Sequence, residues 1–327
     1  MQLPKLAIAA LGGTVSMQAR NAREGVIPTV SGESLVASVP ELLTLAEVKI
    51  ETLGLLPSAS LDFGFLLSVL SWANLQINQG AAGVIIVQGT DTLEETATFF
   101  DYLWDHAEPL VLTGAMRSAD QAGADGPANL LDACRVAAAP GSRTRGAQVV
   151  MNGQIHAGNV VRKTDSLALQ AFTSPIFGPA GLLVEANVRY LRPPSPRKVL
   201  PVPQQTSQRV ALLEATLSAD SLLLENLVAM GYDGLVIAGF GAGHVSADWA
   251  QAIGDAATTI PVVIATRTGS GSTARSSYGF NGSEIDLIGR GALMAGFLCP
   301  RKARILLWLL IGCQRQHELA FFLTHDQ

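Results

Sequence analysis

Residues 84–92 read Val-Ile-Ile-Val-Gln-Gly-Thr-Asp-Thr, and Leu-Glu-Glu-Thr follows at positions 93–96. The apolar residues at the start of this stretch predict a short buried strand. Gly89 is expected to end that strand, because glycine favours tight turns. Thr92 with Glu95 three positions later fits a capping box, which predicts that a helix begins here. The stretch therefore indicates a strand–turn–helix unit of the kind that builds α/β folds.

Thr90 and Asp91 stand at the junction between this strand and this helix. In an open parallel sheet, ligands bind beyond the carboxyl ends of the strands, so both side chains are candidates for a binding or catalytic site. Threonine and aspartate are also common helix caps, and a purely structural role explains either residue taken alone. The rest of the sequence has to decide between the two interpretations.

The chain extends this alternation of strand and helix in both directions. Further strands are predicted at residues 5–11, 47–53, 109–112, 147–151, 210–213, 234–238 and 261–265, and further helices at residues 34–39, 62–79, 221–230, 246–253 and 301–311, with another entered near Pro127. Such alternation favours βαβ units and a mainly parallel sheet. Five prolines between residues 191 and 208 predict a semi-extended connection. We therefore expect an α/β fold with a larger N-terminal domain at residues 1–190, a linker at 191–208 and a smaller α/β domain at 209–327.

The bulk composition excludes several classes of protein. Hydrophobic residues make up 48% and charged residues 15% of the 327, which argues against a disordered chain. The net charge of −5 lacks the basic signature of a nucleic-acid-binding protein. No apolar run reaches the ~18 residues that a membrane span needs, and the amino terminus does not resemble a secretory signal peptide. We expect a cytoplasmic protein that binds neither nucleic acid nor membrane.

The motifs indicate neither a metal nor a nucleotide cofactor. Cys134, Cys299 and Cys313 are odd in number and lack metal-ligand spacing, so we expect buried or half-buried free thiols. The five histidines are scattered in the same way, and most are expected at the surface or in packing. The glycines of residues 239–243 follow a predicted strand but do not match the dinucleotide-binding pattern. No cofactor is therefore expected.

Hydroxyl and charged side chains at predicted strand ends carry the remaining chemistry. These residues are Thr14, Ser58, Thr90, Asp91 and Lys163. A threonine hydroxyl becomes a nucleophile when a neighbouring base takes its proton, and a lysine beside a carboxylate can serve that transfer. Backbone amides at the glycine turns can stabilise an oxyanion, as acyl transfer requires. Each residue alone also fits a cap, a turn or a surface cation, and sequence distance alone does not establish that they meet.

Six short motifs, in one order, make the chain similar to the bacterial-type L-asparaginase family. They are Leu-Gly-Gly-Thr-Val at 11–15, Gln-Gly-Thr-Asp-Thr-Leu-Glu-Glu-Thr at 88–96, Thr-Gly-Ala-Met-Arg at 113–117, Ala-Asp-Gly-Pro-Ala-Asn-Leu at 124–130, Arg-Lys-Thr at 162–164 and Lys-Ala-Arg at 302–304. The two threonine motifs together are far more specific than either one alone. The resemblance spans nearly the whole chain. It implies two α/β domains and the hydrolysis of L-asparagine to L-aspartate and ammonia without a cofactor.

The resemblance also implies roles for individual residues. Thr14 would form the acyl-enzyme, and Thr90, Asp91 and Lys163 would form the second polar group of the site. The residues expected to bind the substrate are Gly13, Ser58, Ala59, Gly89, Ala115 and Glu284, with Ser58 at the α-carboxylate and Asp91 also at the α-amino group. Glu284 matches the acidic residue that this family sends across a subunit interface, which implies a homodimer or homotetramer.

The chain departs from the family's usual pattern in its first and last thirds. Val26 stands where the lid tyrosine is expected, and valine cannot relay a proton to or from Thr14. Ala59 and Ser60 replace the usual glutamine and aspartate, so recognition of the substrate's α-amino group differs in detail. His244 takes the place of an asparagine. The segments 57–60 and 239–244 resemble a separate branch of the family that carries the same replacements.

Two other functions stay open on the same fold. One is hydrolysis of glutamine or of another amide or ester, because the extra methylene of glutamine is worth only ~1–3 kcal/mol in a binding pocket. The other is a non-catalytic amino-acid-binding protein, which the valine at position 26 suggests. The Thr90, Asp91 and Lys163 set favours an enzyme, because binding alone does not need the lysine.

Overall fold

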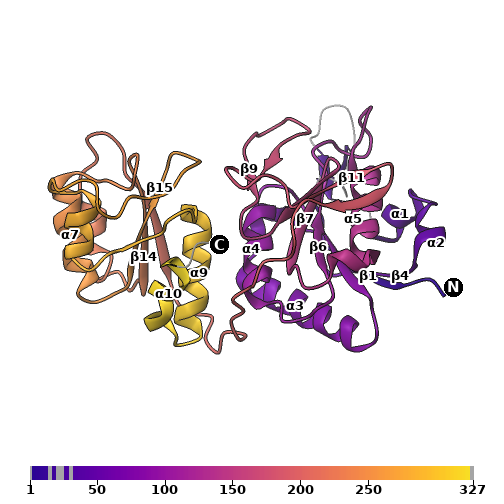
Figure 1. The fold of residues 1–327 in the computed structure, drawn as a ribbon, viewed down its shortest axis with the longest axis horizontal. Helices are drawn as coiled ribbons and strands as arrows, with labels where there is room; N and C mark the ends of the chain where they lie inside the picture. The colour runs from indigo at the N-terminus through magenta and orange to yellow at the C-terminus, as the bar shows by residue number, and fades with distance from the viewer. Residues whose placement is uncertain (1, 14–16, 20–25, 29–31, 325–327) are drawn as a thin grey trace. The chain divides into compact units, whose positions relative to one another are not determined.

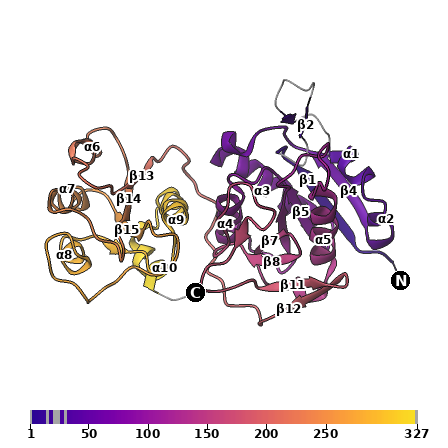
Figure 2. The same ribbon diagram turned by 90° about the horizontal axis from the view of Figure 1, so that it is seen from above.

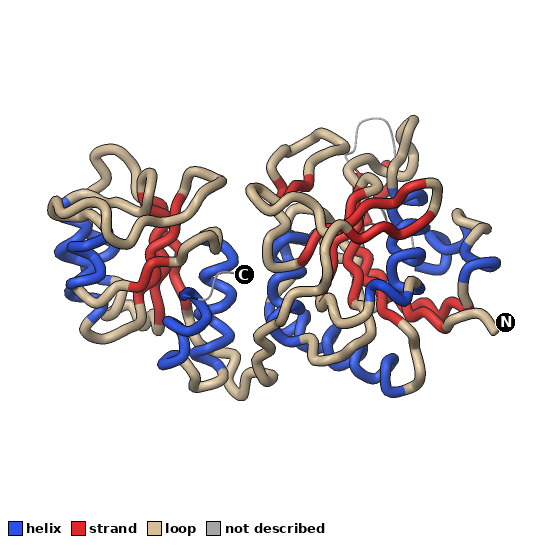
Figure 3. Tube along the Cα trace, in the orientation of Figure 1, coloured by secondary structure: helices blue, strands red, loops and turns tan. Residues whose placement is uncertain are grey.

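The computed structural model describes residues 2–13, 17–19, 26–28 and 32–324, and it divides into two compact units, Met1–Val199 and Leu200–Gln327 (Figure 1). Each unit is built around one main sheet with helices packed against it (Figure 3). The predicted α/β class, with a larger and mainly parallel first sheet and a smaller second α/β unit, is confirmed. Within the described ranges, none of the helices is both long and apolar enough to cross a membrane.

The first unit is built on an eight-stranded sheet in the order β12-β11-β8-β7-β6-β5-β1-β4. Its parallel strands are β4 (Glu47–Thr52), β1 (Lys5–Ala10), β5 (Gly83–Val87), β6 (Leu110–Thr113) and β7 (Ala147–Met151). Three antiparallel strands extend the sheet, namely β8 (Gln154–Ala157), β11 (Gly181–Val184) and β12 (Asn187–Tyr190). Two antiparallel pairs form separate sheets, β2 (Met17–Ala19) with β3 (Val26–Pro28), and β9 (Arg162–Lys163) with β10 (Phe172–Thr173).

Helices cover both faces of the parallel part of this sheet (Figure 2). One face packs in a single apolar cluster with α5 (Gly126–Ala138), α1 (Gly32–Ala37) and α2 (Leu42–Leu45), and the other contacts α3 (Phe63–Asn78) and α4 (Leu93–Leu103). β5 is buried along its whole length, as expected of a central parallel strand between two layers of helices. Gly83 lets α5 approach this strand closely, since a Cβ there would lie 2.7 Å from the carbonyl oxygen of Ala137.

The predicted strand and helix around residues 84–92 are present as β5 and α4, but the predicted capping box is wrong. Thr92 is the N-cap residue of α4, yet its side chain makes no cap hydrogen bond. Its Oγ1 donates instead to the carbonyl oxygen of Ser58 at 3.0 Å. A side-chain cap does begin α3, where Asp62 accepts a hydrogen bond from the N–H of Phe65 at 2.7 Å.

The second unit is a four-stranded parallel sheet. Its strands in spatial order are β13 (Val210–Glu214), β14 (Gly234–Gly239), β15 (Val262–Thr266) and β16 (Leu293–Met294). One face shares an apolar cluster with α6 (Leu222–Asn226), α7 (Ala247–Ala257) and α8 (Glu284–Gly289), and α9 (Pro300–Gly312) packs on the sheet beside α10 (Leu319–Thr324). The helix predicted at residues 221–230 is shorter than expected, because the chain continues in turns after α6. The three cysteines are free and buried or half-buried, as predicted.

Candidate active site

Three adjacent strands of the first sheet, β1, β5 and β6, run parallel, so their carboxyl ends meet at one edge. The chain leaves these strands through Gly13, Gly89 and Gly114. A Cβ on Gly13, whose φ is +87°, would lie 2.1 Å from the amide nitrogen of Gly89. A Cβ on Gly114 would lie 2.5 Å from the carbonyl oxygen of Gln88. The strand ends therefore pack backbone against backbone, an approach that only glycine allows.

Ser58 lies against this edge at the start of a short 3₁₀ helix (Ser58–Ser60). A Cβ on Gly89 would lie 2.8 Å from Ser58 Oγ, so the serine hydroxyl and the glycine turn are in contact. The residue is 3% exposed, and its Oγ has no hydrogen-bond partner in the described part of the chain. A buried hydroxyl without a partner costs about 1–3 kcal/mol, which makes this oxygen a candidate ligand group. Ala59 beside it is exposed, whereas Ala115, after Gly114, is buried.

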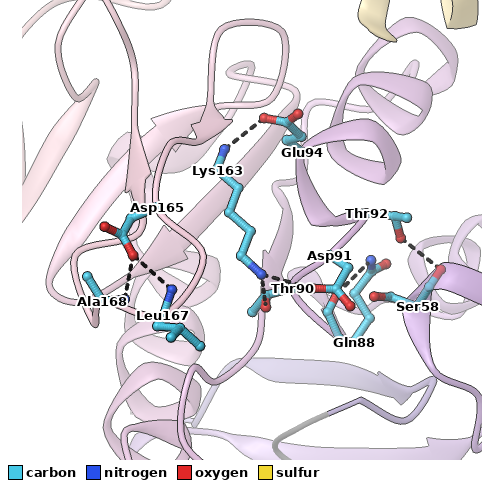
Figure 4. Close-up of polar contacts among 11 residues, drawn as sticks. Ser58, Gln88, Thr90, Asp91, Thr92, Glu94, Lys163, Asp165, Leu167 and Ala168 are labelled. Atoms are coloured by element: carbon cyan, nitrogen blue, oxygen red, sulfur yellow. Dashed lines mark hydrogen bonds and ion pairs between the residues drawn. The ribbon is translucent and has the colours of Figure 1, made fainter. Parts of the chain in front are cut away.

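Thr90, Asp91 and Lys163 meet beside the same strand ends (Figure 4). Lys163 Nζ donates to Oγ1 of Thr90 at 3.0 Å and to Oδ1 of Asp91 at 2.9 Å. Thr90 is 5% exposed, while the side chain of Asp91 is 71% exposed. The contact therefore runs from a buried hydroxyl to a carboxylate in solvent. Because Thr92 occupies the N-cap position of α4, helix capping does not account for Thr90 and Asp91.

This group is better suited to chemistry than to stability. An ion pair with a mostly exposed partner contributes little to folding, so the contact between Lys163 and Asp91 adds about 0–1 kcal/mol. An ammonium group beside a hydroxyl can orient that hydroxyl, and with the carboxylate it can handle protons during acyl transfer. Among the described residues, no three His, Cys, Asp or Glu side chains are grouped so that they could hold a metal ion.

Asp125 and Asn129 hold the turn after β6, a role that the sequence did not predict. Asp125 Oδ2 accepts a hydrogen bond from the N–H of Met116 at 3.0 Å. Asn129 Nδ2 donates to the carbonyl oxygen of Gly114 at 3.0 Å. Both residues belong to the motif at 124–130, whose composition indicates a turn entering a helix but does not identify the partners of the side chains.

The structure thus brings together the predicted site residues that belong to the first unit and that it describes. Thr14 lies outside the described residues and directly follows Gly13 in the sequence. Val26, at the position of the missing tyrosine, belongs to β3, whose backbone pairs with β2. Glu284 belongs to the second unit and is described there.

Glu284 is the first residue of α8 and is fully buried, with 0% exposure. Its Oε1 accepts hydrogen bonds from the N–H groups of Ser277 at 2.6 Å and Tyr278 at 2.7 Å, and its Oε2 lies 3.1 Å from Nε2 of His244. The His244 ring packs edge-on against Tyr278 and Phe280. Burial favours the neutral acid, but the backbone amides and His244 outweigh it, so the pKa of Glu284 lies below its usual value.

Two family models together match nearly the whole chain. The model of the N-terminal domain of asparaginase matches residues 5–196, and that of the glutaminase/asparaginase C-terminal domain matches residues 209–320. The chain belongs to the asparaginase family. The predicted family, its two-domain fold and the prediction of an asparaginase-type enzyme are therefore confirmed.

Relatives in the asparaginase family align over most of their length. A probable periplasmic L-asparaginase of Haemophilus influenzae is 33% identical over 317 residues, which is 94% of this chain and 89% of the relative. L-asparaginase 2 of Escherichia coli is 33% identical over 319 residues, covering 95% and 90% of the two chains. The crystal structure of a probable cytoplasmic L-asparaginase from Campylobacter jejuni superposes with a TM-score of 0.88 at 27% identity, over 99% of this chain and 100% of that one.

Sequence similarity over most of the chain also extends to relatives with another name. A glutamyl-tRNA(Gln) amidotransferase component of Methanosarcina acetivorans is 29% identical over 99% of this chain and 78% of its own length. Membership of the family therefore leaves the amide substrate to be argued from the site itself.

Proposed function

We propose that the protein hydrolyses L-asparagine to L-aspartate and ammonia through a threonine acyl-enzyme. The observation that carries the proposal is the contact of Lys163 Nζ with Thr90 at 3.0 Å and Asp91 at 2.9 Å, beside the ends of parallel strands. The backbone contact between Gly13 and Gly89 supports it further, because it joins the two threonine motifs of the sequence at one edge of the sheet.

The reaction proceeds in two acyl-transfer steps. The Thr14 hydroxyl attacks the side-chain amide carbon of asparagine, the carbon–nitrogen bond breaks, and the nitrogen takes up a proton and leaves as ammonia. Water then attacks the resulting ester, which releases aspartate and restores the hydroxyl. Thr90 and Lys163 orient and relay protons, and backbone amides of the glycine turns stabilise the oxyanion of each step. No cofactor takes part.

The substrate's own charged groups are bound by the residues around this edge. Ser58 binds the α-carboxylate, which its buried and unpartnered Oγ supports. Asp91 binds both Lys163 and the substrate's α-ammonium group, since the Asp91 side chain is largely exposed and can accept a second partner. The adjoining walls of the site are formed by Gly89, which contacts Ser58, and by two alanines. Ala59 follows Ser58 in the sequence, and Ala115 follows Gly114.

Ammonia release by the purified protein tests the proposal, with L-asparagine, L-glutamine and simple amides assayed side by side. Thr14→Ala and Thr90→Ala are each expected to abolish turnover. Thr44→Ala is a matched control, because the exposed Thr44 hydroxyl donates only to the nearby carbonyl oxygen of Glu41 at 2.9 Å among the contacts described for it. Full activity in either site variant contradicts the threonine mechanism.

A second candidate is a protein that binds an amino acid without turning it over, which the valine at position 26 favours. Calorimetry with L-aspartate and L-asparagine separates the two: heat of binding with no ammonia above the Thr14→Ala background supports the second candidate. Faster turnover of glutamine or another amide keeps the mechanism and changes the substrate.

The assembly and the compartment are further parts of this proposal. We place Glu284 near the active site of a neighbouring subunit in a homodimer or homotetramer, and light scattering on the full chain distinguishes these from a monomer. We place the protein in the cytoplasm, in line with the name of the Campylobacter jejuni neighbour, although the Haemophilus influenzae relative is named periplasmic. Cell fractionation decides between the two compartments.

A further inference from the structure

Lys163 lies on a strand that is too short to fix the position of the lysine by itself. β9 contains only Arg162 and Lys163, and its antiparallel partner β10 pairs Lys163 with Phe172. The neighbouring hydrogen bond of this pair runs from the N–H of Thr164 to the carbonyl oxygen of Ala171 at 2.8 Å. A separate two-stranded sheet such as β9 with β10 is marginally stable on its own, so the lysine needs another anchor if its ammonium group is to stay near Thr90.

Glu94 provides that anchor from α4. Its Oε2 accepts a hydrogen bond from the backbone N–H of Lys163 at 2.7 Å, and the residue is 3% exposed. Figure 4 shows the lysine stretched between two contacts, with its backbone nitrogen at Glu94 and its Nζ at Thr90 and Asp91. Both ends of Lys163 are thus held by one segment, the turn and first residues of α4.

A second contact fixes the same stretch to the same helix. The Thr98 hydroxyl, which is fully buried, lies 2.9 Å from the carbonyl oxygens of both Glu94 and Gly158. A Cβ on Gly158 would lie 2.8 Å from the carbonyl oxygen of Ala97, so the chain passes directly over α4 before it reaches β9. The segment that leads into Lys163 is therefore anchored on α4 at its beginning and at its end.

We infer that Glu94 is a positioning residue for the reaction, which sets where the Lys163 ammonium group stands relative to Thr90. The inference rests on the proposed function for its catalytic consequence. A hydrogen bond to a carboxylate is roughly twice as strong as one between neutral groups, and a low-dielectric site strengthens it further. If the backbone of Lys163 shifts, its Nζ moves away from the hydroxyl that it orients, and a displacement of about 1 Å costs on the order of 10²-fold in rate.

Three substitutions at position 94 separate the effect of where the accepting oxygen lies from the effect of its negative charge. Glu94→Gln keeps an oxygen at the same distance and removes the charge, so we expect kcat to fall by less than about tenfold. Glu94→Asp keeps the charge but withdraws the oxygens by about 1.5 Å, and Glu94→Ala removes them. Both of these are expected to lower kcat by on the order of 10²-fold, with KM near its parent value. Glu95→Gln, one position further along α4, is the charge-matched control and should resemble the parent.

Hydrogen exchange of the Lys163 amide supplies a readout that does not depend on turnover. The amide should exchange slowly in the parent, in Glu94→Gln and in Glu95→Gln, and rapidly in Glu94→Asp. Equal kcat losses in Glu94→Gln and Glu94→Asp, or unchanged exchange in Glu94→Asp, overturn the inference. A parent protein that releases no ammonia from any amide overturns the proposed function instead, and the exchange comparison then still shows whether Glu94 holds Lys163.

Discussion

Replacing Gly13 with alanine should damage the site far more than the size of a methyl group suggests. A Cβ at this position would lie 2.1 Å from the amide nitrogen and 2.2 Å from the Cα of Gly89, and ordinary contact begins at 3.4 Å. Both neighbours are backbone atoms, so no side chain can turn aside. The two strand ends must separate by roughly 1 Å, and a misplacement of that size costs on the order of 10²-fold in kcat.

The expected loss of stability has two parts that a control can separate. The φ of +87° at Gly13 costs an L-residue about 1–2 kcal/mol, and overpacking adds about 1–3 kcal/mol. Gly80 has a φ of +92° with no neighbouring atom within 4 Å of an added Cβ, so Gly80→Ala meets only the first cost. Urea unfolding and ammonia release would be measured on both variants. Equal losses of stability, together with parent-like turnover in Gly13→Ala, would refute the packing argument.

Other predictions concern single groups. Ser58→Ala is expected to raise KM by at least tenfold and to leave the free energy of unfolding unchanged or increased, because the buried Oγ has no partner in the described chain. A large loss of stability with an unchanged KM would contradict this expectation. Lys163→Met should lower kcat by about 10²-fold or more with a change in Tm too small to account for it, since Asp91, its ion-pair partner, is mostly exposed. A parent-like kcat would exclude the lysine from the mechanism. Folding lowers the pKa of Glu284, so its negative charge stabilises the protein at pH values above the usual pKa of 4.5, and this contribution is lost as the pH falls through the lowered pKa. The difference in Tm between the parent and Glu284→Gln should therefore shrink in acid. A difference that grows in acid would contradict the direction of the pKa shift. Burial raises the pKa of Cys134 to about 12, so a thiol reagent at neutral pH should leave it unmodified until the protein unfolds, as mass spectrometry can check.

The sequence predicts well those parts of the fold in which local pattern and burial agree. The all-apolar run before Gln88 gives β5, and the apolar spacing after Thr92 gives α4, because a strand buried on both faces and the helix after it each have a clear period. The antiparallel strands at the other edge of the sheet are short and partly exposed, as the alternating burial of β12 shows. Their period is too brief to distinguish them from loops.

Contacts between distant residues mark the limit of what the pattern reveals. The capping box failed because the hydroxyl of Thr92 bonds to Ser58, which is 34 positions away in the sequence. The contact of Lys163 with Thr90 spans 73 positions, and only the resemblance to a family, not spacing, suggested it. Glu94 was visible within a motif, but its partner is the backbone of a residue 69 positions later, for which a sequence holds no local signal.

The separation of 73 positions between Thr90 and Lys163 in the sequence has a consequence for the chain while it is being synthesised. Synthesis proceeds from the N-terminus, so Thr90 and Asp91 emerge from the ribosome well before Lys163 and its pairing partner Phe172. The lysine contact cannot form until the whole parallel sheet and the hairpin that follows have been made. A prematurely released chain ending before residue 163 would contain the threonine turn but no ammonium group beside it. Under the proposed mechanism, such a fragment would not hydrolyse amides, because it lacks the lysine that stands beside Thr90 in the full chain.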